Sequence, residues 1–229
     1  MNITFHGHSC VQISAGGHSL IIDPFLSGNP LSVTKPEEIK VDAVLLTHAH
    51  NDHILDAADI AKANDVPIVA TFELANVMSW KGAKTMEVNL GGTAQLGFAE
   101  AQLVQAFHSS GIVLEEEQRV LYAGMPGGYI IHWNGKTIYH AGDTALFSDM
   151  EMFGRLHDID LAFIPIGDTY TMGPKEAAIA AEWTKAKQVV PIHFNTFPKI
   201  QQDTDAFIQL LAERGIKGIA LKPGESMEL

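Results

Sequence analysis

The sequence contains a single cysteine, Cys10, which excludes an internal disulfide bond. It also has no apolar run that approaches the roughly 20 residues needed for a membrane span. Its first residues lack the basic start and the apolar stretch that are typical of a signal peptide. We therefore expect a cytoplasmic protein with no membrane partner.

Basic residues are also scarce. The chain has 15 Lys and Arg against 27 Asp and Glu, and its formal net charge is −12. No Lys/Arg cluster offsets this charge locally, and a negative field repels phosphodiester backbones. The composition therefore predicts no nucleic-acid partner.

The hydrophobic pattern mixes hairpins with strand–helix units. Residues 10–14 and 18–23 alternate around a Gly pair, and Asn134-Gly135 is a strong hairpin signal. A buried strand over 41–46 precedes a helix over 54–63 and a strand over 66–69. Further helices are predicted over 72–80, 174–186 and 203–214, and strands over 161–166 and 188–192. The pattern favours an α/β fold, a four-layer αββα sandwich of two mixed β-sheets flanked by helices, in one domain over residues 1–229.

The segment after the strand over 41–46 has a high density of metal-ligand residues. It reads His48-Ala49-His50-Asn51-Asp52-His53. In extended backbone, residues two apart point the same way, so His48 and His50 can approach one ion. Asp52 and His53 lie at the turn into the predicted helix and could face a second ion. A solvated polar turn is the alternative interpretation, but four potential ligands in six residues favour a metal site.

Three more candidate ligands each follow a predicted strand. His108 comes after the run over 101–107, Asp143 after the strand that ends at His140, and His193 after the strand over 188–192. Strand ends are where open α/β sheets usually place their sites. Imidazole and carboxylate ligands suit Zn, Mn, Fe, Ni or Co.

The motif and the later His, Asp and His resemble those of the metallo-β-lactamase superfamily. The chain looks most like a branch of small bacterial and archaeal metal-dependent hydrolases of undefined substrate, related to ascorbate-phosphate lactonases. This resemblance extends over segments from one end of the chain to the other, at residues 7–9, 22–26, 106–110, 139–144, 171–174 and 222–226.

The resemblance implies a two-metal centre and a metallo-β-lactamase fold. His48, His50 and His108 would hold the first ion, Asp52, His53 and His193 the second, and Asp143 would bridge both. True β-lactamases of the superfamily commonly have Cys at the position of Asp143, so a carboxylate there argues against a role in antibiotic resistance. Relatives are often oligomeric, which implies a homo-oligomer.

The predicted function is metal-dependent hydrolysis of a small ester, lactone, thioester or phosphodiester by a metal-bridging hydroxide. Zinc is the first expected metal. The resemblance suggests that Asp52 is the metal ligand best placed to accept a proton as well, and it suggests that His8 supports the metal ligands or contacts the substrate. A hydrogen-bonded structural histidine is the alternative for His8.

Other candidates have weaker signals. His140 could support the site or belong to the core, and Asp168 and Tyr170 lie in a Gly-rich stretch that could line the pocket. Relatives often have a Gly-His-Phe-like sequence where this chain has 168–170, and this departure argues against carrying over the substrate preference of the branch.

Two other functions fit the same ligands. One is an iron-dependent oxidoreductase on the same fold, although no flavin-binding or rubredoxin-like segment is present. The other is a metal-binding protein without turnover, although a structural zinc site is usually closed by four ligands that include thiolates.

Overall fold

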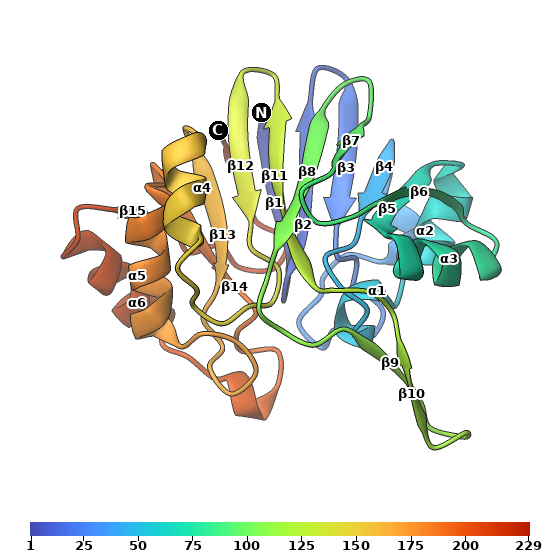
Figure 1. The fold of residues 1–229 in the computed structure, drawn as a ribbon. Helices are drawn as coiled ribbons and strands as arrows, with labels where there is room; N and C mark the ends of the chain where they lie inside the picture. Colours follow the sequence, from blue (N-terminus) through green and yellow to red (C-terminus); the bar gives the residue numbers. More distant parts are fainter.

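The computed structural model describes residues 1–229 and contains two seven-stranded sheets that face each other (Figure 1). The first sheet has the order β16-β1-β2-β3-β4-β5-β6, and the second has the order β15-β14-β13-β12-β11-β8-β7. Helices cover the outer face of each sheet, as Figure 1 shows at its left and right sides. The predicted four-layer αββα sandwich is confirmed.

The first sheet contains the N-terminal strands and, at one edge, the last strand of the chain. Its strands are β1 (Asn2–Gly7), β2 (Cys10–Ala15), β3 (His18–Ile22), β4 (Ala43–Leu45), β5 (Pro67–Thr71), β6 (Lys84–Val88) and β16 (Ser226–Glu228). β2 and β3 form the predicted hairpin, and β3, β4, β5 and β6 are parallel. The outer face packs on α1 (Asn51–Ile54), α2 (Ala57–Asn64) and α3 (Phe72–Trp80).

The second sheet is formed by strands between β7 and β15. Its strands are β7 (Thr93–Gln95), β8 (Glu100–Gln105), β11 (Gly127–Trp133), β12 (Lys136–His140), β13 (Leu161–Pro165), β14 (Gln188–Ile192) and β15 (Lys217–Gly218). The helices on this side are α4 (Met150–Leu156), α5 (Pro174–Thr184) and α6 (Thr204–Ala212). Two short 3-10 helices lie in loops: η1 (Pro36–Glu38) between β3 and β4, and η2 (Pro198–Ile200) between β14 and α6. β12, β13, β14 and β15 are parallel, so the loops after β12 and β14 emerge at the same edge.

Three apolar clusters hold the layers together. One lies between the sheets and includes Phe5, Leu45, Tyr129 and Phe163, and the other two lie between each sheet and its helices. This arrangement follows from the sequence, because the central parallel strands are apolar on both faces.

Two features differ from the sequence prediction. The single helix expected over 54–63 is replaced by two helices, α1 and α2, with a break before Asp56. The Asp56 carboxylate accepts hydrogen bonds from the backbone N–H groups of Leu26 and Ser27, and this contact holds the chain at the break. A two-stranded arm of β9 (Gly111–Leu114) and β10 (Arg119–Tyr122) was not predicted, and it projects away from both sheets (Figure 1). The acidic run over 115–117 lies at its turn.

Candidate metal centre

The loop after β4 presents the four residues of the histidine-rich motif. The backbone is extended at His50, which is the N-cap of α1, and the helix then carries Asp52 and His53 in its first turn. His48 and His53 are buried, whereas His50 and Asp52 are partly exposed. The change from extended to helical backbone therefore divides the motif into two pairs, as the spacing predicted.

The first group consists of His48, His50 and His108. The Nε2 atom of His48 lies 3.0 Å from Nδ1 of His50, and Nε2 of His108 lies 3.3 Å from the same Nδ1 atom. The three nitrogens lie within 4.8 Å of one another. The loop after β4 and the loop after β8 thus bring three imidazole nitrogens together.

The second group consists of His8, Asp52, His53 and His193, whose ligand atoms also lie within 4.8 Å of one another. Nε2 of His8 is 3.2 Å from Oδ2 of Asp52. The backbone N–H of His193 donates a 2.7 Å hydrogen bond to the His8 carbonyl oxygen, which joins the loops after β14 and β1. His8 therefore lies inside the site.

Asp143 lies between the two groups. Its Oδ2 atom is 2.9 Å from Nε2 of His193 and 3.3 Å from Nε2 of His53. The same oxygen is 3.6 Å from Nε2 of His108 and 3.9 Å from Nε2 of His48. Asp143 is buried, and its Oδ1 atom has no hydrogen-bond partner. One carboxylate thus faces both groups.

A tight turn fixes the position of Asp143. Gly142 has a φ of +62°, and a Cβ atom there would lie 2.5 Å from the carbonyl oxygen of Gly127 and 3.0 Å from Cβ of Thr47. Only glycine fits this turn without displacement of its neighbours.

Asp23 lies next to the site and orients one of its histidines. It was not predicted as a site residue. Its Oδ2 atom accepts hydrogen bonds from Nδ1 of His53 (2.8 Å) and Oγ1 of Thr47 (2.6 Å), and its Oδ1 atom accepts one from the Thr47 N–H. Asp23 also lies near His48, but its oxygens already have these donors. A carboxylate that orients a histidine in this way is typical of metal sites. The available signal was an acidic residue directly after the apolar strand β3.

Burial and neighbouring carboxylates shift the pKa values of the inner histidines in opposite directions. Burial would lower the pKa of His53, but the carboxylates of Asp143 and Asp23 outweigh it and raise that pKa well above the ordinary value. Burial and the positive His53 lower the pKa of His48 well below the ordinary value.

The His8–Asp52 pair is set up for a neutral imidazole and an ionised carboxylate. Burial and the proximity of His193 lower the pKa of His8 to about 4. Burial would raise the pKa of Asp52, but the hydrogen bond from His8 and the charge of His53 hold it well below the usual range. A neutral His8 donates from Nε2 to Asp52, and its Nδ1 atom can accept from Oγ1 of Thr196 at 3.0 Å.

These atoms fit bound cations. Nε2 of His53 and Oδ1 of Asp143 are buried and lack hydrogen-bond partners. Hydrogen bonds among the histidines cannot satisfy three converging nitrogens, and unsatisfied buried polar groups are costly. Nitrogen and carboxylate donors without a thiolate suit divalent ions such as Zn²⁺ and Mn²⁺.

The three weaker candidates, His140, Asp168 and Tyr170, lie in different places relative to the site. His140 is fully buried, donates from Nε2 to the Ser9 carbonyl oxygen and accepts from the Gly142 N–H, so its contacts support the core and the turn before Asp143. Tyr170 lines a cavity of about 470 Å³ beside Asp52, whereas Asp168 does not.

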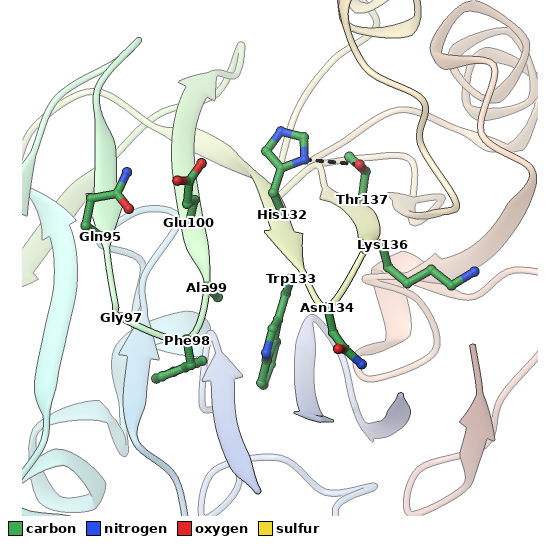
Figure 2. Close-up of a pocket in the computed structure, with 11 residues that line it drawn as sticks. Gln95, Gly97, Phe98, Ala99, Glu100, His132, Trp133, Asn134, Lys136 and Thr137 are labelled. Carbon is green, nitrogen blue, oxygen red and sulfur yellow. Dashed lines mark hydrogen bonds between the residues drawn. The ribbon is translucent and has the colours of Figure 1, made fainter. Parts of the chain in front are cut away.

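Another cavity, of about 500 Å³, lies at the hairpin turns of β7–β8 and β11–β12 (Figure 2). These turns precede β8 and β12, so the cavity lies at the opposite end of the strands from Asp143. Figure 2 shows Glu100, His132 and Trp133 around it, and none of the candidate ligands.

Comparison with known proteins defines the class. A family model described as a beta-lactamase superfamily domain matches residues 18–194. Together with the fold, this match makes the chain a member of the metallo-β-lactamase superfamily.

Relatives narrow the assignment. The chain is 54% identical to a UPF0173 metal-dependent hydrolase of Anoxybacillus flavithermus, over the full length of both chains. The solved structure of Igni18, a metallo hydrolase of the archaeon Ignicoccus hospitalis, has a TM-score of 0.89 and 35% identity, covering 100% of this chain and 98% of that one. The protein belongs to the UPF0173 family of metal-dependent hydrolases.

The fold also occurs with other chemistry. A diiron β-hydroxylase from Streptomyces venezuelae aligns with a TM-score of 0.74 at 15% identity, covering 100% of this chain and 54% of that one. Similarity at this level shows the shared fold alone.

None of the helices here combines the length and the apolar character required to traverse a bilayer.

Proposed function

We propose that this hydrolase binds two divalent ions and cleaves a small ester, lactone, thioester or phosphodiester. His48, His50 and His108 would hold one ion, Asp52, His53 and His193 the other, and Asp143 would contact both. The single observation that carries this proposal is the position of Asp143 Oδ2, which faces imidazole nitrogens of both groups at 2.9–3.9 Å.

Bound metal ions would supply Lewis acidity, which lowers the pKa of water and polarises the scissile oxygen. Zinc is the first candidate, and Mn, Fe, Ni or Co suit the same donors. The chain contributes the geometry. Asp23 holds His53 through Nδ1, so that Nε2 of His53 faces the centre.

Asp52 is the proposed proton acceptor of the chain. Its side chain is 29% exposed and it lines the cavity of about 470 Å³, so a substrate can reach it. Its low pKa keeps it ionised at neutral pH. His8 orients it through the 3.2 Å contact, and Thr196 fixes the other side of the His8 ring. A proton taken up at Asp52 could then pass to the leaving group.

An open cavity beside the centre favours catalysis over simple metal storage. A structural site would instead be closed around its ion. The oxidoreductase alternative makes a distinct prediction, since it requires iron with redox activity.

The test is metal content by elemental analysis, with turnover of a panel of phosphodiesters, lactones, esters and thioesters. We expect about two ions per wild-type chain, and a loss of both metal and turnover in Asp143→Ala. The matched control is Asp158→Ala, because the Asp158 side chain is 86% exposed and pairs with Lys187 on the surface. Wild-type protein that remains inert after Zn, Mn, Fe, Ni or Co is added would contradict the proposal, and a redox-active iron centre would favour the oxidoreductase.

A further inference from the structure

The cavity beside Asp52 adjoins the second ligand group directly. Asp52, Tyr170, Phe197, Pro198 and Lys199 line it. The Phe197 ring lies 5.6 Å from the His8 ring, centroid to centroid, and His8 in turn contacts Asp52. Any molecule that fills this cavity therefore lies against the centre. A volume of about 470 Å³ suits a small molecule.

Lys199 is the only cation in the cavity lining. Like Lys81, it forms no ion pair in the structure, but unlike Lys81 it lines the cavity beside Asp52. Its Nζ atom lies 6.0 Å above the centre of the Tyr170 ring, a cation–π distance. This charge is free to bind an anion.

The backbone holds Lys199 and Tyr170 together. The Lys199 carbonyl oxygen accepts a 3.0 Å hydrogen bond from Oγ1 of Thr169, the residue before Tyr170. Lys199 itself lies within η2, which follows the loop of the candidate ligand His193. The loops after β13 and β14 thus bring Lys199 and Tyr170 together in the cavity lining.

The remaining lining is largely apolar. Phe197 and Pro198 supply ring surfaces to the cavity wall, and Tyr170 adds an aromatic face. The cavity thus combines one positive side chain with apolar rings, which is a lining that suits an organic anion.

We infer that the substrate carries an oxyanion group, a carboxylate or a phosphate, away from the bond that is cleaved, and that Lys199 binds this group. A short apolar segment of the substrate lies against Phe197 and Pro198 and joins the anion to the scissile group at the metal ligands. Lys199 is therefore a specificity-determining residue. This inference rests on the proposed function.

Binding of small probes to the metal-loaded protein tests the inference without turnover. Phenylacetate and phenylphosphonate carry the two candidate anions, and phenylacetamide is the neutral match. Titration calorimetry should show that Lys199→Met weakens binding of at least one anion on the order of tenfold, while phenylacetamide changes less than about twofold. Lys199→Arg should restore most of the affinity. Weaker binding of phenylacetate would identify a carboxylate as the preferred anion, and weaker binding of phenylphosphonate would identify a phosphate.

Lys81→Met is the matched control, because Lys81 is an exposed, unpaired lysine at the end of α3 on the first sheet. It should change no binding constant. Anion binding that is equal in wild type and Lys199→Met would mean that the metals alone recognise the anion, and would overturn the inference.

A kinetic comparison separates this inference from the proposed function. We expect Lys199→Met to lower kcat/KM for mono-4-nitrophenyl adipate about tenfold, through KM, and to leave 4-nitrophenyl hexanoate within about twofold. Equal effects on both esters would overturn the role of Lys199 and leave the hydrolase proposal intact. If wild type cleaves no member of the substrate panel, the hydrolase proposal fails, and the binding constants still decide whether Lys199 recognises an anion.

Discussion

Nδ1 of His53 donates a 2.8 Å hydrogen bond to Oδ2 of Asp23, and both side chains are completely buried. This bond leaves Nε2 of His53 free to face Asp143. The histidine can therefore present only one nitrogen to the centre, and the carboxylate behind it determines which one.

Asp23→Asn should weaken metal binding by about 10- to 100-fold with little change in fold. An asparagine has one acceptor oxygen, so its amide nitrogen would face either the Thr47 N–H or Nδ1 of His53, both of which donate to Asp23. The measurement is metal affinity by competition with a chelator.

Asp42→Asn is the control for this prediction. Asp42 accepts a hydrogen bond from the Ser19 backbone, but it lies near the surface, away from the ligands. A metal affinity of Asp23→Asn equal to that of Asp42→Asn would contradict the role assigned to Asp23.

The turn at Gly142 should tolerate no side chain. Gly135 has a similar φ of +74° but open space around it, so Gly135→Ala should cost about 1 kcal/mol of unfolding free energy through backbone strain alone. Gly142→Ala adds the overlap with Gly127 and Thr47 and should cost roughly 1–3 kcal/mol more. Chemical denaturation of both variants measures the difference. Equal losses would show that the close approach at Gly142 is unimportant.

The metal-free protein should lose stability as pH falls from 7 to 5. Burial lowers the pKa of several histidines below the ordinary value of 6.5, and that of His8 to about 4. These histidines are His6, His8, His48, His50, His108, His140 and His157. Below pH 6.5 the unfolded chain binds protons that the folded chain does not, so the free energy of unfolding falls, by up to about 1.4 kcal/mol per pH unit for each proton.

His53 acts in the opposite sense. Its raised pKa gives stability that is fully present below pH 6.5 and is lost as pH rises towards the folded-state value, so it opposes the other histidines above pH 6.5 and leaves the slope below it unchanged. Urea denaturation of chelator-treated protein at pH 5, 6 and 7 gives the slope. His140→Gln should reduce the slope. A flat profile would contradict the prediction.

The sequence pattern predicted that the ligand candidates would lie together, because each follows a strand and strand ends converge at one edge of the sandwich, whereas their division into two groups was implied by the family resemblance. His48, His50, Asp52 and His53 were predicted from spacing alone. Asp23 was not, because its role depends on a contact with His53, 30 positions away, that no local pattern encodes. The break between α1 and α2 escaped prediction for the same reason, since Asp56 bonds to the distant Leu26 and Ser27.

The structure also placed His8 and Tyr170, whose positions local patterns left open. His8 joins the second group through contacts with Asp52 and Thr196, and Tyr170 lines the cavity beside Asp52. Both placements depend on how the loops of the two sheets meet. Their roles in binding and catalysis remain predictions.

The candidate ligands come from both sheets, and this has a consequence for the order of events during synthesis. Residues 48–53 are made early, but the proposed centre also needs His193, close to the end of a 229-residue chain. A nascent chain that stops before His193 can hold at most an incomplete set of donors. The proposed centre therefore predicts that full metal loading is a late step in the maturation of the protein, after residues of both sheets have come together.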